Sequence, residues 1–215
     1  MHKMLFFLTI ALVAASCGLS GWDSLLKEYS RVDDVRQILL VKYTGGSDAI
    51  AEFYQKDAHG RWELVEKGSA YVGRNGIGKE REGDGRTPEG ELRVRRAFGI
   101  LDNPGCSLEY VKVTQTTFAC DEDSPWYNTI IDTAAVHHNC HGEDMSAMVP
   151  AYNYGLETDY NDANVYPLGS AIFIHCKSLK YPHTSGCVAL DEPFMKKVLT
   201  TAGKGLVISV HPAGW

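Results

Sequence analysis

Short apolar runs separated by turn-forming residues recur along most of this chain, and this pattern predicts strands. One run, residues 170–174, is apolar after its first residue, Ser170, as in a strand buried on both faces. The predicted strands are residues 37–43, 49–55, 62–72, 91–96, 111–117, 126–132, 152–160, 170–174 and 206–210. Many strands with short connections indicate a mainly β fold, a single β-sandwich or open barrel with a few short helices.

Two segments have the spacing of apolar residues that is typical of helices. Asp23 is expected to N-cap a short helix that continues through Leu25 and Tyr29. The stronger helical pattern has Asp191 at the N-cap position and ends before Gly203.

The first sixteen residues have the pattern of a secretory signal peptide. Lys3 precedes an apolar run at 5–13 and small residues at 14–16. Cys17 follows directly, so residues 13–17 resemble a bacterial lipobox, with a lipid anchor to the membrane on this cysteine; simple cleavage and secretion is the alternative. We therefore expect an exported protein of the bacterial periplasm or cell envelope, with one domain over residues 22–215.

Composition and charge narrow the possible function classes. The chain has 215 residues, 44% of them hydrophobic, and 21 Lys and Arg against 27 Asp and Glu give a net charge of −6. The basic residues are scattered, apart from a small cluster of Arg93, Arg95 and Arg96 that we interpret as a solvated strand face. Because nucleic-acid binding needs a basic face, we expect no nucleic-acid partner.

Five cysteines remain after the signal sequence, namely Cys106, Cys120, Cys140, Cys176 and Cys187. Cysteines tend to pair in an oxidising compartment, and an odd number leaves at least one free thiol. We predict a disulfide between Cys106 and Cys120, which lie on either side of a probable β segment. Pairing of Cys140 with either of these two is the alternative.

The surroundings of Cys187 and His175 point to chemistry. His175 ends the buried strand, and Cys187 follows Gly186 after a connection that folds back. A thiol with an ordinary pKa of about 8.5 is mostly protonated at neutral pH, so a nucleophilic cysteine needs an imidazole to take its proton. The backbone N–H groups of Gly186 and Cys187 would then bind an oxyanion. A packing role is the alternative for a buried cysteine.

Three segments of the chain together resemble the L,D-transpeptidase catalytic domain of the YkuD type. They are the glycine-rich stretch 72–90, the strand 169–175 and the segment 184–190. The likeness extends over nearly the whole chain after the signal sequence. It implies an L,D-transpeptidase-like catalytic domain over residues 22–215, with no metal or organic cofactor and with peptidoglycan stem peptides as the partner.

The resemblance also assigns roles to residues. Cys187 would be the nucleophile and His175 the general base, with the backbone carbonyl of Cys176 orienting the imidazole ring through its other nitrogen. Gly186 would give room for a sharp turn and, with Cys187, supply the oxyanion donors. Ser185 stands where many family members have a histidine.

The implied reaction is a two-step acyl transfer on peptidoglycan. The cysteine would expel the terminal D-alanine from a tetrapeptide stem to leave a thioester, which an amine of a neighbouring stem would resolve as a 3-3 crosslink. Attack by water would make the protein an L,D-carboxypeptidase. We expect substrate contacts from Thr184, Ser185 and Tyr154, with core packing as the default interpretation for Tyr154.

A histidine-rich loop within residues 133–151 offers a rival interpretation. Imidazole and thiolate are zinc ligands, and His137, His138, Cys140 and His141 lie within five positions. This spacing is too tight for a standard structural site, and Asp144 is the nearest further ligand, so a solvated loop or a lid over a cleft is favoured. A zinc-dependent envelope hydrolase remains a separate hypothesis.

A non-catalytic, wall-binding lipoprotein with the same fold is a further hypothesis. Thiol labelling separates it from the enzyme, since an activated Cys187 is expected to react with iodoacetamide well below pH 8.

Two further interpretations concern residues near these segments. Glu82 and Asp84 are interpreted as turn-forming rather than as a carboxylate pair for glycoside hydrolysis. A disulfide between Cys176 and Cys187 would be a redox switch.

Overall fold

The computed structural model describes residues 20–215. The predicted signal peptide, residues 1–16, and the lipobox cysteine Cys17 lie outside the described residues. No helix within residues 20–215 has the length and hydropathy needed to cross a membrane.

The described residues form two α-helices, one short 3-10 helix and twelve strands. The helices are α1 (Gly21–Tyr29), the 3-10 helix η1 (Met145–Ala147) and α2 (Glu192–Thr201). The strands are β1 (Gln37–Gly45), β2 (Asp48–Lys56), β3 (Trp62–Tyr71), β4 (Gly90–Gly99), β5 (Tyr110–Lys112), β6 (Thr117–Cys120), β7 (Ile130–Asp132), β8 (Gly142–Asp144), β9 (Gly155–Thr158), β10 (Phe173–Cys176), β11 (Val188–Leu190) and β12 (Leu206–Pro212).

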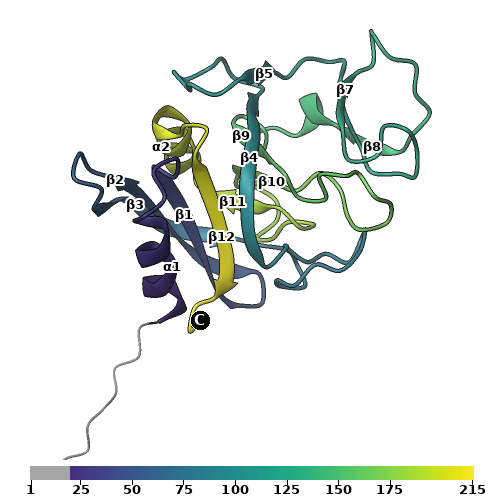
Figure 1. The fold of residues 1–215 in the computed structure, drawn as a ribbon. Coiled ribbons are helices and arrows are strands. Elements are labelled where there is room, and N and C mark those ends of the chain that lie inside the picture. Colours follow the sequence, from purple (N-terminus) through teal and green to yellow (C-terminus); the bar gives the residue numbers. More distant parts are fainter. Residues whose placement is uncertain (1–19) are drawn as a thin grey trace, which may run out of the picture.

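The larger sheet closes on itself, and the prediction of a mainly β fold is confirmed. Its strands follow the order β12-β1-β2-β3-β11-β10-β9-β4-β5, and an additional pairing of β12 with β4 joins the ends of an eight-stranded ring, leaving β5 outside it (Figure 1). The barrel is therefore closed, whereas a sandwich or an open barrel was expected. Closure pairs the backbone groups that an open sheet would leave at its edges.

The burial of β1 explains how the barrel is covered. Residues 37–41 are buried on both faces of the strand. Leu39 and Val41 pack into the barrel core, whereas Ile38 and Leu40 pack against α1 in a separate cluster with Trp22. A strand between a core and a covering helix needs apolar residues on both faces, which accounts for its continuous run.

Both predicted helices are present, with one difference at each N-terminus. The hydroxyl of Ser20 accepts a hydrogen bond from the backbone N–H of Asp23, so Ser20 is the N-cap of α1 and Asp23 lies in the first turn. Asp191 is the N-cap of α2 but makes no capping hydrogen bond with its side chain. Its carboxylate instead forms an ion pair with Lys177 at 3.1 Å.

A second, three-stranded sheet of order β7-β6-β8 lies beside the barrel, on the right in Figure 1. It divides the predicted strand at 111–117, because the hydroxyl of Thr117 accepts from the N–H of Thr114 and the chain turns before β6. The predicted loop at 133–151 contains β8 and η1. We call residues 117–144, which contain this sheet, the lid.

The lid contains a disulfide that corrects the predicted pairing. Cys120 is bonded to Cys140, and Cys106, Cys176 and Cys187 are free. The predicted Cys106–Cys120 disulfide is wrong because Cys106 packs in the barrel core, whereas Cys120 pairs with Gly142 across β6 and β8. That pairing brings Cys140, two residues before Gly142, beside Cys120.

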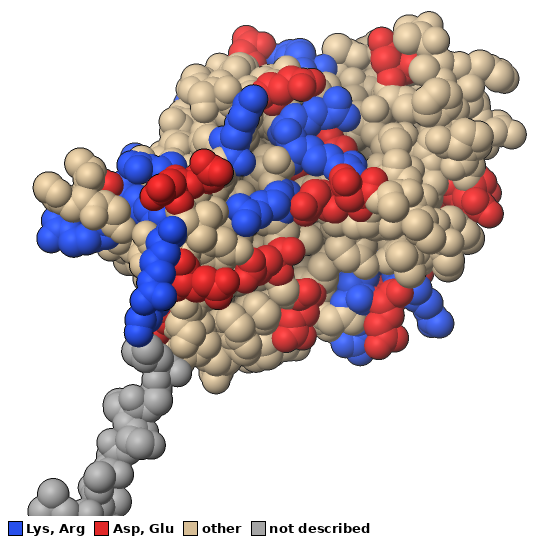
Figure 2. Space-filling model, viewed as in Figure 1, with Lys and Arg blue, Asp and Glu red and all other residues tan. Residues whose placement is uncertain are grey.

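Charged side chains of both signs are mixed on the face drawn in Figure 2. The cluster of three arginines belongs to this pattern. Arg95 forms ion pairs with Glu157 and Asp162, and Arg96 with Glu157. Arg95 and Arg96 are thus paired with carboxylates on their own surface.

Candidate active site

The two segments that carry the site lie side by side in the barrel. β10 and β11 pair in parallel, with His175 opposite Ala189. Cys187 comes immediately before β11. Side chains two residues apart on a strand share a face, so Cys187 lies on the face of Ala189, and Phe173 on the face of His175.

Contacts with Tyr152 show that Cys187 and His175 share one side of the sheet. Cys187, Phe173 and Tyr152 belong to one buried cluster. The Tyr152 ring meets the imidazole of His175 edge to face, with ring centroids 5.4 Å apart. The tertiary structure therefore brings the predicted nucleophile and the predicted base together around one tyrosine.

His175 makes the hydrogen bond that the resemblance implied. Its Nδ1 lies 2.7 Å from the backbone carbonyl oxygen of Cys176. A carbonyl oxygen only accepts, so Nδ1 carries the hydrogen and Nε2 has a free lone pair. Burial lowers the pKa of the imidazole to about 4. The hydrogen bond to the Cys176 carbonyl raises this pKa, but by less than burial lowers it. At neutral pH, His175 is an uncharged base.

The Cys187 thiol has two backbone partners. Its Sγ accepts a hydrogen bond from the N–H of Phe173 at 3.3 Å and donates one to the carbonyl of Ala171 at 3.2 Å. Burial raises the pKa of this thiol to about 12, and the nearby Glu143 carboxylate acts in the same direction. The lowered pKa expected from the sequence is therefore not what the structure gives, because the thiol is enclosed and its proton points to a carbonyl.

We predict slow alkylation of Cys187 in the substrate-free protein. With a thiol pKa of about 12, only about one molecule in ten thousand is a thiolate at pH 8. The rate of iodoacetamide labelling, followed by mass spectrometry of the peptide that contains Cys187, is expected to rise steadily from pH 6 to pH 9. His175→Ala is the control and is expected to change this rate little. A plateau between pH 6 and pH 8 would show a preformed ion pair instead.

Two buried threonine hydroxyls hold the backbone of Cys187. Thr87 and Thr184 both donate to its carbonyl oxygen, at 3.0 Å and 2.7 Å, and the Thr184 hydroxyl accepts from the N–H of Gly186 at 3.1 Å. The Thr184 hydroxyl, which we had expected to contact substrate, is thus engaged in holding the backbone of the predicted nucleophile. The N–H of Gly186 is already bonded, so of the two predicted oxyanion donors only that of Cys187 remains a candidate.

The other two predicted substrate contacts have different positions. Ser185 is exposed, lines the pocket described below and accepts a hydrogen bond from Arg74 at 3.2 Å. Tyr154 is buried in the barrel core with Leu156 and Cys176. Tyr154, directly before β9, packs in a different buried cluster from Cys187, so the default interpretation of core packing is confirmed. The side chain of Cys176 also points into this core, away from Cys187.

A pocket opens in front of Cys187 between the barrel and the lid. Its lining residues are Lys79, Glu82, Ala119, Asp121, Glu143, Ser170, Ala171, Ile172, Ser185, Gly186 and Cys187. The ammonium of Lys79, almost fully buried, forms an ion pair with Asp84 at 3.0 Å. Asp84 also accepts from the backbone N–H groups of three residues of its own turn, as predicted for a turn-forming residue.

Glu143 connects the lid to the aromatic residue beside the site. Its carboxylate accepts a hydrogen bond from the Tyr152 hydroxyl at 2.5 Å. Burial raises the pKa of Glu143. The lid therefore contributes a carboxylate to the pocket and supports the tyrosine that touches His175.

Asn128 is a functional residue that the sequence pattern did not reveal. Its side-chain oxygen accepts from the N–H of Ala171, and its amide donates to the carbonyls of Tyr160 and Asn161 and to the side chain of Asn164. Ala171 has a φ of 50°, in the left-handed region that non-glycine residues seldom adopt. Asn128 thus holds the strained residue whose carbonyl accepts the thiol proton.

Asn128→Ala is expected to destabilise the protein by about 2–4 kcal/mol, because the backbone N–H and C=O groups that it satisfies would lose their partner. Activity should fall further than stability, since Ala171 would relax and displace its carbonyl from Cys187. Urea unfolding and muropeptide turnover measure the two effects. The exposed residue Asn139 supplies the matched control, and Asn139→Ala should change neither. Unchanged activity in a folded Asn128→Ala variant would contradict this role.

The histidine-rich loop does not gather into one site. The Nδ1 of His141 pairs with Asp121 at 2.7 Å, and His137 is exposed. His138 lies against Cys140, which is bonded to Cys120. Neither Cys140 nor any of these three histidines lines the pocket in front of Cys187.

This chain is similar to one protein-family model and to solved structures. The family model of the YkuD L,D-transpeptidase catalytic domain matches residues 47–210. No curated protein matches the chain. One solved structure that matches is the helical cell shape determining protein Pgp2 (K307A mutant) from Campylobacter jejuni, with 17% identity over 84% of this chain and a TM-score of 0.45. The match covers 48% of that structure's chain, so this chain spans about half of its length.

Proposed function

The chain belongs to the family of YkuD L,D-transpeptidase catalytic domains, and from this premise we propose that it is a cysteine acyltransferase that forms 3-3 crosslinks between peptidoglycan stem peptides. One observation carries the proposal. The hydrogen bond from Nδ1 of His175 to the Cys176 carbonyl leaves Nε2 as an uncharged base on the face of the sheet that also holds Cys187.

In the first step, substrate binding turns the thiol proton of Cys187 from the Ala171 carbonyl toward Nε2 of His175. The sulfur attacks the carbonyl carbon of the diamino acid in the stem as Nε2 takes the proton. Because the resting pair is neutral, proton transfer accompanies attack rather than preceding it. The imidazolium then protonates the nitrogen of the departing D-alanine, and a thioester on Cys187 remains.

Charge develops on the substrate oxygen in this step. The N–H of Cys187 is the backbone donor that we assign to it, since the N–H of Gly186 is bonded to Thr184. A positive charge lies close by: the Lys79 ammonium is 3.6 Å from the place where a Cβ on Gly186 would stand. A buried ammonium stabilises an oxyanion more strongly than it would in water.

In the second step, an uncharged amine attacks the thioester and transfers a proton to Nε2 of His175. As the carbon–sulfur bond breaks, the imidazolium returns this proton to the sulfur of Cys187. The carboxylates of Glu82, Asp121 and Glu143 line the pocket with one ammonium, that of Lys79. An acidic lining attracts the ammonium form of an acceptor amine. This charge balance supports transpeptidation, and attack by water at the same thioester would give L,D-carboxypeptidase activity.

Export to the periplasm or cell envelope is part of the proposal, because peptidoglycan is found there. It is supported by the signal-peptide pattern of residues 1–16 and by the lipobox-like segment that ends at Cys17.

Incubation of the purified protein with disaccharide tetrapeptides, followed by mass spectrometry of the products, tests the proposal. We expect a crosslinked dimer that has lost one alanine. Accumulation of tripeptide alone would identify a carboxypeptidase. Unchanged tetrapeptide that nevertheless binds the protein would identify a non-catalytic wall-binding protein and contradict both enzymatic readings.

A further inference from the structure

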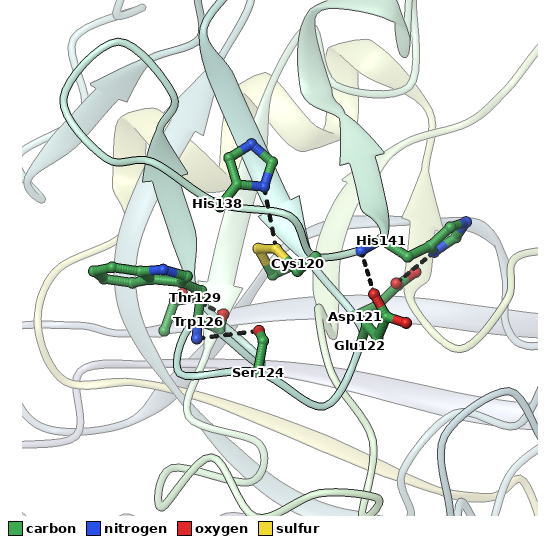
Figure 3. The surroundings of a disulfide bond; sticks show 9 residues. Cys120, Asp121, Glu122, Ser124, Trp126, Thr129, His138 and His141 are labelled. Carbon is green, nitrogen blue, oxygen red and sulfur yellow. Dashed lines mark hydrogen bonds and ion pairs between the residues drawn. A yellow bond between two sulfur atoms is a disulfide. The ribbon is translucent and has the colours of Figure 1, made fainter.

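The lid carries a cluster of sulfur and nitrogen atoms that the proposed acyl transfer does not use. Cys120 and Cys140 form the disulfide, and Nδ1 of His138 lies 3.3 Å from Sγ of Cys140 (Figure 3). The three potential ligand atoms all lie within 4.8 Å of one another. We propose that Cys120, Cys140 and His138 bind a zinc ion when the disulfide is reduced.

The spacing and chemistry of these atoms suit zinc. In a tetrahedral site with thiolate and imidazole ligands, neighbouring ligand atoms stand about 3.5–3.8 Å apart. The distance from His138 to Cys140 is close to this value, and reduction frees the two sulfurs to move apart to it. Two thiolates and one imidazole leave a fourth position on the metal for water or another small ligand.

Backbone hydrogen bonds keep the two cysteines together without the disulfide. Cys120 on β6 is paired with Gly142 on β8. Next to it, the N–H of Asp121 donates to the carbonyl of His141 at 3.1 Å. Because Cys140 lies directly before His141, these hydrogen bonds hold it close to Cys120. A site made of these ligands therefore survives reduction of the bond.

His138 is already turned toward the sulfurs. Its ring packs on Phe118 of β6, with ring centroids 4.7 Å apart, and its side chain is half-buried. While the disulfide is intact, its sulfur has no hydrogen, so the Nδ1–H of His138 is the donor in this contact. Binding of zinc requires the other tautomer, with the hydrogen on Nε2 and the Nδ1 lone pair on the metal.

The other two histidines of the loop are outside this site. His141 is paired with Asp121, and His137 is exposed. The sequence alone suggested a different set, His137, His138, Cys140 and His141 within five positions. Cys120, which comes from another strand, replaces both His137 and His141.

Zinc binding at this site follows reduction of the disulfide. A dithiol reductant gives two electrons and two protons to the Cys120–Cys140 disulfide and becomes a disulfide itself. The two resulting thiols each lose a proton as a sulfur–zinc bond forms, and zinc does not change its oxidation state. Both the disulfide and the zinc site would join β6 to the segment that contains Cys140, directly before β8. Ala119 of β6 and the adjoining Asp121 line the pocket in front of Cys187.

Zinc titration of the full chain tests this site. The protein is reduced with a dithiol, freed of reductant without oxygen, and mixed with zinc chloride in competition with a chromophoric chelator; native mass spectrometry counts the metal. We expect one zinc per reduced chain and binding at least about 100-fold weaker in the oxidised protein. Cys120→Ser and Cys140→Ser should each lower the zinc affinity of the reduced protein by a similar factor, and His138→Ala should lower it at least about tenfold. His137→Ala is the matched control and should bind as the wild type does.

The experiment is made in a Cys187→Ser background, which removes the catalytic thiol as a competing ligand. Equal zinc binding by the reduced parent and its Cys120→Ser variant would overturn the proposal, as would unchanged affinity in His138→Ala. Circular dichroism checks that each reduced variant is folded. If a variant unfolds, cobalt(II) replaces zinc in the reduced parent; a thiolate-to-cobalt charge-transfer band supports the site, and its absence overturns it.

Discussion

Replacing Cys187 by alanine is expected to lower the rate of muropeptide conversion by at least about a thousandfold, because no other group in the pocket can form the thioester. The buried side chain of Cys187 is small. Its backbone carbonyl oxygen, which an alanine would retain, accepts hydrogen bonds from Thr87 and Thr184. The variant should therefore stay folded. Mass spectrometry of the products and urea unfolding measure the two properties.

Cys106→Ala is the matched control for this variant. Cys106 is also a buried free cysteine, but it packs in the barrel core, away from the pocket. Its replacement should leave the rate nearly unchanged. Conversion at the wild-type rate by Cys187→Ala would refute the acyl-enzyme mechanism.

Acidification is expected to destabilise the wild-type protein more than a His175→Gln variant. The pKa of His175 is lowered from 6.5 to about 4 in the folded chain by burial. Between these two values the unfolded chain binds a proton that the folded chain does not, so the free energy of unfolding falls as the pH decreases from about 6.5 to about 4. The shift corresponds to about 3 kcal/mol.

Glutamine cannot be protonated in this range, so His175→Gln should lose less stability on acidification by about this amount. Urea unfolding of both proteins at pH 7 and pH 4 gives the difference. The carboxylates that also titrate in this range are common to both proteins and cancel in the comparison. Equal loss of stability in the two proteins would show that His175 is not held neutral by burial.

The same value of the pKa sets the acid limit of activity. His175 remains an uncharged base down to about pH 4, so kcat/KM should persist into mild acid if the protein remains folded. His175→Gln should be inactive at every pH, because its amide cannot accept the thiol proton.

Both α-helices and most strands were readable from local patterns, whereas β8 lies in the segment 133–151 that was predicted as a loop. Each predicted strand overlaps an observed strand, because alternating or continuous apolar runs reflect burial on one or both faces of a sheet. The family was also readable, since segments 72–90, 169–175 and 184–190 carry its motifs in order. These properties depend on residues that are neighbours in sequence.

Contacts between distant segments followed no such pattern. The Cys120–Cys140 bond depends on β6 pairing with β8, and barrel closure depends on β12 pairing with β4. Asn128 meets Ala171 across 43 residues. A periodicity of two or of 3.6 in the apolar residues indicates which face of a strand or helix is buried, but it does not indicate which other element covers that face.

The sequence by itself determined the mainly β fold, the family and the identity of Cys187 and His175 as the candidate pair. The tertiary structure alone decided their protonation, since enclosure of the thiol and the imidazole sets both pKa values and directs the thiol proton to Ala171. It also decided that Thr184 holds the backbone of Cys187. The physical reason is that desolvation and hydrogen bonding depend on all the atoms around a group, most of which come from elsewhere in the chain.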